Sequence, residues 1–560
     1  MKYIYIDDYN YIKNNLSLFK SKTTFITSSI AVHNLISKKL RIKSFLLGNQ
    51  KNFDKNFNLL KKEFLNFHKI LNILDKDKNI NKLKINKDLK IFFNSHRYYT
   101  SLEYASIKNI IYNLDILCKK IKIKKIYLIG NLRFRFFSNK VFQEELKLNN
   151  INLEICEKTI TSNNVNLKFL NFLNKFNSLT VSQIILYFKK NLSKALIFSP
   201  KKNLIFEPLW DFFYYPYKLS QNYFINLNKI NFETTNKTYV NLDYLKIIKK
   251  NKFKFSSFFL KFLINQTFII DKKVFNSLFF LNKLRRKYRI KNICWCCDPD
   301  AILANIVEYF RKENIRVYGI QHGGSYNLQN YNFLHKFSDF SFCDKYLSYG
   351  ISNKTKNSKI IDSGSFKSEY YKNEIKKIHI TELKKNVVLF IVGGVNEIYP
   401  NKNNPYIQFN FQKNAYNYLK SNKVKTIIKI PQVIEQTKYP ILDYIDQNHK
   451  KTLISKIKTY KAINLYKPKL IILDRLSTTL YECLFYEIEI ILFLDKKDLP
   501  YSDILKILKK RVHFVYNIHE FKNVYKMILE KKVSKLDNDF LNKFYIRKKN
   551  KKIKNFIDTF

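Results

Sequence analysis

Two apolar runs in the C-terminal third decide the fold: NVVLFIVGG at 386–394 and PKLIILD at 468–474. Each is a hydrophobic run of strand length that stops at glycine or at aspartate. TIIKI at 426–430 and IEIILFLD at 488–495 are runs of the same kind. Such runs are typical of parallel strands that are buried on both faces. The sequence therefore predicts a parallel sheet in this region.

Helical segments separate these strands. Three are expected, at 404–422, 453–463 and 479–486. Alternating strands and helices predict a Rossmann-like domain, which we place at 385–535. A basic helical tail is expected at 536–560.

The start of the chain alternates in the same way. Strands are expected at 2–7, 24–29, 44–49 and 125–131. The segment IAVHNLISKKL at 30–40 has helical spacing, and Ser28 and Ser29 precede it as candidate caps. A second Rossmann-like unit is therefore predicted.

Residues 160–285 differ from both units. They are rich in Phe, Tyr and Leu and have few strand signals, which predicts a mainly helical insertion. Strands return at 292–297 and 316–320. We place an N-terminal Rossmann-like domain with this insertion at 1–345 and a connector at 346–384. The expected fold class is α/β, with two Rossmann-like domains facing a cleft.

The composition is strongly basic. The chain has 560 residues, with 102 Lys and Arg against 44 Asp and Glu, and a formal net charge of +58. Lys predominates and is spread over the whole chain, whereas base and phosphate recognition favours the Arg fork. We therefore expect no role in nucleic-acid binding, but an attraction to anionic membrane surfaces. A non-catalytic basic protein that binds nucleic acid or a membrane surface is an alternative.

The sequence also predicts a compartment. Asp7 and Asp8 stand where the apolar region of a signal peptide would run, and no apolar run approaches the length of a membrane span. Seven Cys without paired C-x2-C spacing fit a reducing environment. We expect a cytoplasmic protein that works at the inner face of the membrane.

The first candidate site is Gln321-His322-Gly323-Gly324, which directly follows an expected strand. Glycines permit close approach of the backbone to a ligand, and histidine titrates near neutral pH. Ligands of open α/β sheets bind at the carboxyl ends of the strands. We predict that these residues form the catalytic centre, with His322 as a base or as a ligand of a phosphate or carboxylate. A glycine turn with a structural histidine is the alternative.

The second candidate site follows the strand that ends at Asp474. Ser477, Thr478 and Thr479 open a helix, where hydroxyls and free backbone N–H groups favour a phosphate. Glu482, about one turn later, is suited to accept from ribose hydroxyls. An ordinary helix cap is the alternative interpretation.

Two further positions are candidates for the donor site. Gly393 and Gly394 follow an apolar strand, as in the glycine turns that admit a pyrophosphate. Lys429 is a cation at the end of another strand. A plain tight turn and one ordinary lysine among many are the alternatives.

Five segments carry a family resemblance. They are GIQHGGSYN at 319–327, DKYLSYG at 344–350, KIIDSGS at 359–365, IIKIP at 427–431 and IILDRLSTTLYECL at 471–484. Their order resembles bacterial surface-carbohydrate transferases of the GT-B fold, in particular O-antigen-type transferases with a Q-H-G-G-x-Y loop. Capsule Kdo and sialic-acid transferases and CDP-glycerol glycerophosphotransferases are more distantly similar.

The resemblance implies roles for particular residues. His322 matches the histidine at the catalytic centre of these transferases, and Ser477, Thr478 and Glu482 match their donor-binding residues. These relatives often have K-x-H-P where this chain has Lys429-Ile430-Pro431, which bears on the type of donor.

The predicted function is therefore glycosyl transfer in surface-polysaccharide biosynthesis. The nucleotide sugar is a substrate, no cofactor is expected, and the acceptor is lipid-linked or a polysaccharide. Asp298-Pro299-Asp300 has the D-x-D pattern of Mn²⁺ sites in GT-A transferases, but it also fits an ordinary helix start, so no metal is expected. A sugar-nucleotide epimerase of the same fold is an alternative, although it needs paired acids that the sequence does not reveal.

Overall fold

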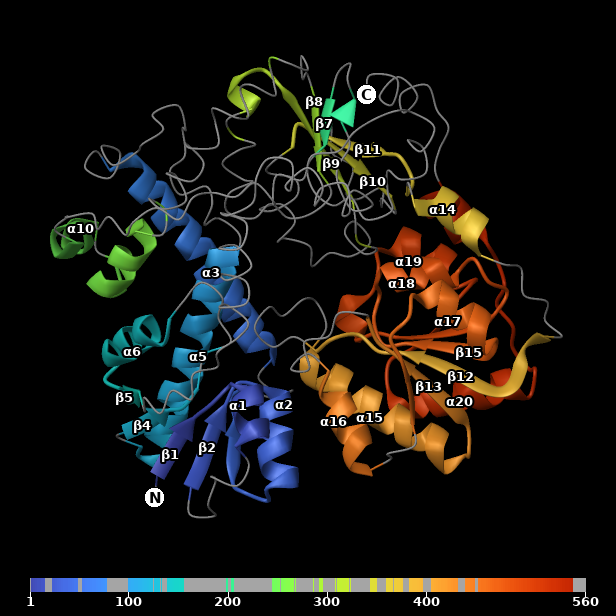
Figure 1. Ribbon diagram of the computed structural model, residues 1–560, viewed down its shortest axis with the longest axis horizontal. Coiled ribbons are helices and arrows are strands. Elements are labelled where there is room, and N and C mark those ends of the chain that lie inside the picture. The colour runs from blue at the N-terminus through green and yellow to red at the C-terminus, as the bar shows by residue number, and fades with distance from the viewer. Residues whose placement is uncertain are drawn as a thin grey trace, which may run out of the picture.

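A computed structural model gives the fold (Figure 1). The structure describes residues 2–15, 23–48, 53–77, 99–123, 125–130, 132, 138–155, 198–199, 203–205, 244–251, 253–265, 267, 286, 292–295, 308, 310–321, 323, 343–349, 359–365, 367–375, 382–395, 404–431, 439–448 and 452–546.

The first sheet is parallel, with strand order β3-β2-β1-β4-β5. Its strands are β1 (Lys2–Tyr5), β2 (Thr23–Thr27), β3 (Ser44–Leu46), β4 (Lys125–Leu128) and β5 (Asn152–Ile155). Its helices are α1 (Tyr9–Asn14), α2 (Ile30–Asn34), α3 (Phe53–Lys76), α5 (Tyr99–Ile121) and α6 (Asn139–Lys147). The four strands expected at the start of the chain are confirmed, and Ser29 caps α2 by accepting a hydrogen bond from the Val32 amide.

The third sheet is also parallel, with order β14-β13-β12-β15-β16-β17. Its strands are β12 (Lys384–Ile391), β13 (Lys425–Lys429), β14 (Leu453–Ser455), β15 (Pro468–Leu473), β16 (Glu489–Phe493) and β17 (His513–Val515). Its helices are α15 (Pro405–Ser421), α16 (Pro440–Asn448), α17 (Thr459–Tyr466), α18 (Thr478–Cys483), α19 (Ser502–Leu508) and α20 (Ile518–Leu529). This is the doubly wound order of a Rossmann fold, which the first sheet shares over five strands. The predicted α/β class with two Rossmann-like units is confirmed.

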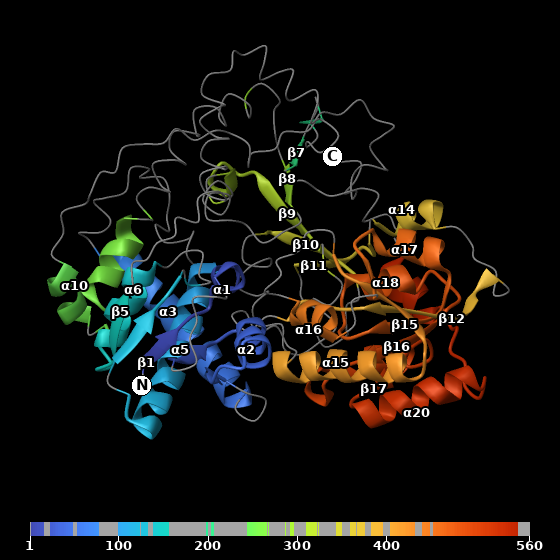
Figure 2. The same cartoon turned by 60° about the horizontal axis from the view of Figure 1, so that its bottom comes forward.

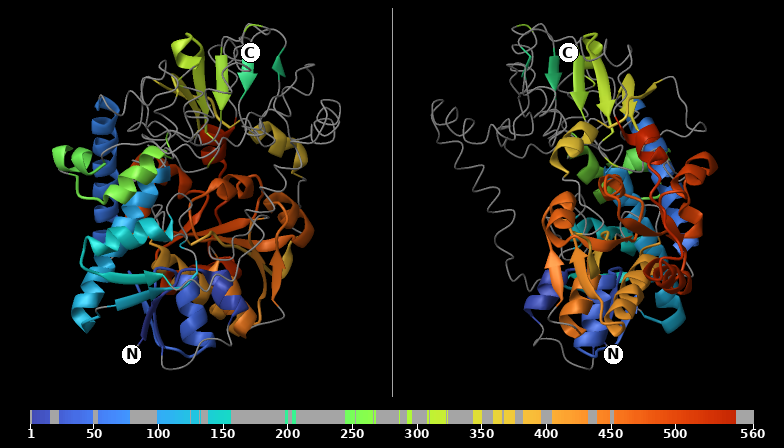
Figure 3. Two further views of the ribbon diagram at one scale, coloured as in Figure 1. Left: turned by 60° about the vertical axis from the view of Figure 1, so that its left-hand side comes forward. Right: turned by 90° about the vertical axis from the view of Figure 1, so that its right-hand side faces the viewer.

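A second, separate sheet was not expected. It has the order β11-β10-β9-β8-β7-β6 and lies at the opposite end of the molecule from β1 (Figures 1 and 3). Its strands are β6 (Phe198–Ser199), β7 (Asn203–Ile205), β8 (Asn292–Trp295), β9 (Arg316–Ile320), β10 (Lys345–Ser348) and β11 (Ile360–Asp362). Strands β8 and β9 confirm the predicted ones.

The remaining strands of the second sheet lie in segments that were expected to be a helical insertion or a connector. β6 and β7 lie within 160–285, which was expected to be a helical insertion. The structure also describes the helix α10 (Tyr244–Asn251) in this range. Most of 160–285 lies outside the described residues. β10 and β11 occupy the region interpreted as a connector at 346–384, together with the helix α14 (Lys367–Glu374). Strands of two to four residues are too short to give a periodic signal.

One other expectation needs correction. The predicted helix at 453–463 is the strand β14 followed by α17, which begins at Thr459. The expected helical tail at 536–560 is described only to residue 546, where it contains one π-helical turn, Leu541–Tyr545, with Phe544 and Tyr545 buried in the core. In the part of the chain that the structure describes, no helix combines the length and apolarity needed to cross a membrane.

The two Rossmann-like units contact each other through helices, as Figure 2 shows for α2 beside α15 and α16. The Tyr9 hydroxyl donates a hydrogen bond to the Asp443 carboxylate, and the Tyr406 hydroxyl donates to the Leu47 carbonyl at 3.3 Å. Ile30 of α2 is buried in the hydrophobic core of the third-sheet domain. The first unit is therefore docked on the helices that cover one face of the third sheet.

A buried guanidinium fixes the end of the third-sheet domain. Arg511 is 1% exposed and donates to the carbonyls of Tyr486 (2.6 Å), Ile488 (3.1 Å) and Lys535 (3.0 Å). Burial lowers its pKa. It thereby ties the turn after α18 to the chain that leaves the domain.

Arg511→Met is expected to lower the free energy of unfolding by about 3 kcal/mol, because three carbonyls lose a charged donor. The measurement is urea denaturation, with the exposed neighbour Lys509→Met as the control. Equal denaturation midpoints for Arg511→Met and wild type would show that these bonds add nothing to stability.

Candidate functional site

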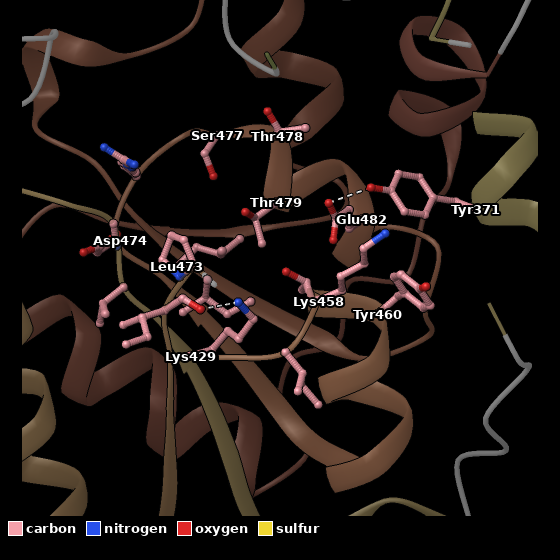
Figure 4. A pocket seen from close by; sticks show the side chains of 18 of the residues that line it. Tyr371, Lys429, Lys458, Tyr460, Leu473, Asp474, Ser477, Thr478, Thr479 and Glu482 are labelled. Carbon is pink, nitrogen blue, oxygen red and sulfur yellow. Dashed lines mark hydrogen bonds between the residues drawn. The ribbon is translucent and has the colours of Figure 1, made fainter. Parts of the chain in front are cut away.

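A cavity of about 460 Å³ lies at the carboxyl edge of the third sheet (Figure 4). It is placed where β12 and β15 are neighbours, the point at which the strand order reverses and ligands of doubly wound sheets bind. Its walls come from α14, from the ends of β12, β13 and β15, and from the starts of α17 and α18. Six of the seven predicted donor-site residues line it: Gly393, Lys429, Ser477, Thr478, Thr479 and Glu482.

The glycine turn after β12 is held by a buried polar network. The Asp474 carboxylate accepts from the Gly393 amide at 2.8 Å, from Gln408 at 3.2 Å and from Gln412. Burial raises the pKa of Asp474, although the adjacent Arg475 and these donors oppose the rise. Asp474 therefore serves the turn rather than the ligand.

The Gly393 backbone lies directly against the Arg475 side chain. A Cβ atom at position 393 would meet the outer atoms of that side chain, which would have to shift. Arg475 also donates to the Gly394 carbonyl at 3.2 Å. Gly394 itself is not among the cavity-lining residues, so it shapes the turn behind the wall.

Lys429 brings a buried cation to the floor of the cavity. Its side chain is 5% exposed, and its ammonium donates to the Ile430 carbonyl at 2.5 Å. Burial lowers the pKa of Lys429, while the charge of Glu482 opposes that shift. An anion in the cavity would stabilise the protonated form.

Glu482 is a partly buried carboxylate that also lines the cavity. It accepts a hydrogen bond from the Tyr371 hydroxyl at 2.7 Å and another from Thr459. Burial raises its pKa, and these bonds together with Lys367 and Lys429 oppose the rise.

Sequence analysis missed the α14 wall of the cavity. Lys367 and Tyr371 stand one turn apart on this helix, and both line the cavity. The helix has no apolar stripe, because its sequence KSEYYKNE is polar on nearly every side. The one signal available was the pair of tyrosines in an otherwise polar segment.

The start of α18 differs from an ordinary cap. Ser477 occupies the N-cap position with extended backbone, yet its hydroxyl makes no capping hydrogen bond. The helix has only six residues, so its dipole is small. Binding of an anion here therefore depends on the hydroxyls and on the cations around the cavity.

Gln321 of the Q-H-G-G segment is buried directly after β9. Its amide oxygen accepts from the Ser348 hydroxyl and from the Tyr349 amide (3.1 Å), and its amide nitrogen donates to the Gly323 carbonyl at 2.7 Å. The structure thus places Gln321 in a role that holds the loop. His322 and Gly324 lie outside the described residues.

Tyr349 connects this loop to the cavity domain. Besides its amide bond to Gln321, its ring packs edge-on against Tyr481 of α18 at 5.4 Å and against Tyr545 at 5.2 Å. Tyr349 therefore contacts both Gln321 of the Q-H-G-G segment and Tyr481 of α18.

Asp298, Pro299 and Asp300 lie outside the described residues as well. Within the described ranges, no three or more His, Cys, Asp or Glu side chains gather in a way that suits a metal ion.

A family profile described as "LIC12162 family transferase" matches residues 140–510, which is more than half of the chain. No curated protein matches the sequence closely enough to count as a relative.

Several solved structures share a remote likeness. UDP-GlcNAc 2-epimerase of Methanocaldococcus jannaschii, in complex with UDP-GlcNAc and UDP, is 13% identical with a TM-score of 0.34, over 52% of this chain and 81% of that one. A glycosyltransferase of Rickettsia africae is 12% identical with a TM-score of 0.31, over 49% and 77%. MurG of Acinetobacter baumannii is 10% identical with a TM-score of 0.31, over 52% and 79%. Likenesses this remote support no inference about substrate.

Proposed function

The chain belongs to the LIC12162 family of transferases, and from that premise we propose that it transfers a sugar from a nucleotide-activated donor to a growing surface polysaccharide or glycolipid. The observation that carries the proposal is the cavity at the β12–β15 switch point, which gathers six residues predicted for donor binding.

The charge of the cavity suits a nucleoside diphosphate. Four cationic side chains line it: Lys367, Lys429, Lys458 and Arg475. Of its two carboxylates, Asp474 is committed to the glycine turn and Glu482 accepts a hydrogen bond from Tyr371. A diphosphate supplies the negative charge that this arrangement favours, and Ser477, Thr478 and Thr479 add hydroxyl donors.

The proposed roles follow from these positions. The diphosphate leaves with its charge stabilised by Lys429 and the hydroxyls at the start of α18. Glu482 accepts hydrogen bonds from the ribose. His322 acts on the acceptor hydroxyl as a base, or holds an anionic group of a substrate.

The acceptor and the place of action are also proposals. A lipid-linked or polysaccharide acceptor suits an enzyme drawn to the anionic inner face of the membrane by a net charge of +58. The epimerase alternative has less support, because it needs paired acids, and of the two carboxylates that line the described cavity Asp474 is committed to the glycine turn.

The function is tested by incubating the purified protein with UDP-, CDP-, GDP-, ADP- and CMP-sugars and measuring nucleotide release. Release from one class, increased by a glycolipid acceptor, is the expected result. Interconversion of sugar epimers without nucleotide release would favour the epimerase. No turnover, together with salt-dependent binding to any DNA duplex, would favour the charge-driven binding protein.

Activity is expected to survive EDTA, because the phosphate charge is met by lysines, hydroxyls and backbone N–H groups. The measurement is nucleotide release with and without chelator. Loss of activity that Mn²⁺ restores, and that Asp300→Ala abolishes, would assign the metal role to the Asp298-Pro299-Asp300 segment instead.

A further inference from the structure

The α14 helix places one phenol against the cavity carboxylate. Figure 4 shows the Tyr371 hydroxyl directed at Glu482, and the hydrogen bond between them is 2.7 Å long. The Tyr371 ring is itself fixed, because it is buried and packs against Tyr460 and Phe485 at centroid distances of 6.1 and 6.0 Å. The phenol is therefore a rigid donor.

The carboxylate keeps acceptor capacity for a ligand. An ionised carboxylate has about four acceptor positions, and the Tyr371 and Thr459 hydroxyls occupy two of them. The second oxygen of Glu482 is turned away from Tyr371 (Figure 4). Glu482 is thus held in one orientation with acceptor positions left over.

The remaining acceptor positions of the Glu482 carboxylate favour a ligand group that carries hydroxyls. A carboxylate repels phosphate, so Glu482 must face the uncharged part of an anionic ligand. Two neighbouring hydroxyls can both donate to one carboxylate, and the ribose carries such a pair in every ribonucleotide donor.

We infer that Tyr371 is a positioning residue for donor recognition, which holds Glu482 so that its carboxylate accepts hydrogen bonds from the ribose hydroxyls. This inference rests on the proposed function, since it takes the cavity to be the nucleotide site. Through Tyr371, the helix α14, which follows the second sheet, contributes to the selection of ribonucleotides.

The competing explanation is a purely structural bond between α14 and α18. The two explanations differ in ligand preference, which a structural bond does not change. Tyr371→Phe removes only the hydroxyl and keeps the ring packing. Tyr486→Phe is the matched control, because the Tyr486 hydroxyl is also a donor, shared between the Asn464 amide oxygen and the Tyr460 carbonyl, but Tyr486 does not line the cavity.

The experiment uses calorimetric titration of the full chain. Whichever of UDP, CDP, GDP and ADP binds wild type most tightly is compared with its 2′,3′-dideoxy counterpart, and the melting temperature of each variant is recorded. Wild type and Tyr486→Phe are expected to prefer the ribonucleotide by about tenfold to a hundredfold, the contribution of hydrogen bonds to a charged group. In Tyr371→Phe and in Glu482→Gln the preference is expected to fall to about threefold or less.

Each contrary outcome has a distinct meaning. If Tyr371→Phe melts earlier but keeps the wild-type preference, the bond is structural and the inference is overturned. If wild type binds both nucleotides equally well, Glu482 does not contact the ribose, and the inference fails while the proposed function stands. If wild type binds no nucleoside diphosphate and releases nucleotide from none of the nucleotide sugars, the proposed function fails with it.

Discussion

Replacing His322 with alanine is expected to lower turnover by about 10²–10⁴-fold, which is the usual contribution of one general acid or base. In the sequence, His322 stands between Gln321 and Gly323. The Gln321 side-chain amide donates a hydrogen bond of 2.7 Å to the Gly323 carbonyl. Nucleotide binding should change little, because the cavity is lined by residues of the third-sheet domain and α14.

The measurement is steady-state nucleotide release together with a melting curve. The control is His519→Ala, which changes an exposed histidine of α20. Unchanged turnover in His322→Ala, with normal folding, would remove His322 from the catalytic centre. Unchanged turnover with a lower melting temperature would make it a structural histidine of the glycine turn.

Replacing Ser477 and Thr478 together with alanine is expected to weaken nucleoside diphosphate binding by about tenfold to a few hundredfold, because each hydroxyl loses a hydrogen bond to a charged phosphate. Folding should lose no more than about 1 kcal/mol, the cost of a lost cap. In the structure the Ser477 hydroxyl makes no capping hydrogen bond, so its removal should lower the free energy of unfolding by less than this amount.

The matched control is Asn517→Ala at the start of α20. Asn517 does cap its helix, accepting from the Glu520 amide at 2.9 Å, and it is remote from the cavity. This variant should melt earlier and bind nucleotide normally. If the Ser477/Thr478 variant behaves like the Asn517 control, the start of α18 is an ordinary helix terminus and the phosphate lies elsewhere.

Much of the cavity lining was predictable because it lies where strong sequence signals end. The apolar strands β12 and β15 are readable from sequence, and parallel strands bring their carboxyl ends to one edge. Gly393 and Ser477 therefore had to be neighbours once the sheet was recognised. Lys429 followed for the same reason, at the end of β13.

The α14 wall and the outer strands of the second sheet could not be predicted in this way. Tyr371 reaches Glu482 across more than a hundred residues of sequence, and a polar helix carries no periodic signal that would mark its cavity face. β6 and β7 are held as strands by pairing with their neighbours, which is a tertiary effect that local sequence does not encode.

The role of Asp474 also depended on tertiary contacts. It ends an apolar strand, as catalytic acids often do, yet Gln408 and Gln412 of α15 reach its carboxylate and commit it to the Gly393 turn. Spacing alone does not distinguish an acid that faces a ligand from one that holds a turn.

The central claim is that the cavity of the third sheet holds the nucleotide of the donor. The most direct measurement is photolabelling with an azido analogue of the nucleotide sugar that supports release, followed by mass-spectrometric mapping of the labelled peptides. The label is expected on segments that line the cavity, around 391–393, 429–431, 457–460 and 473–482, and unlabelled nucleoside diphosphate should prevent it. Label confined to the first sheet, or spread over surface lysines and unaffected by competitor, would contradict the claim.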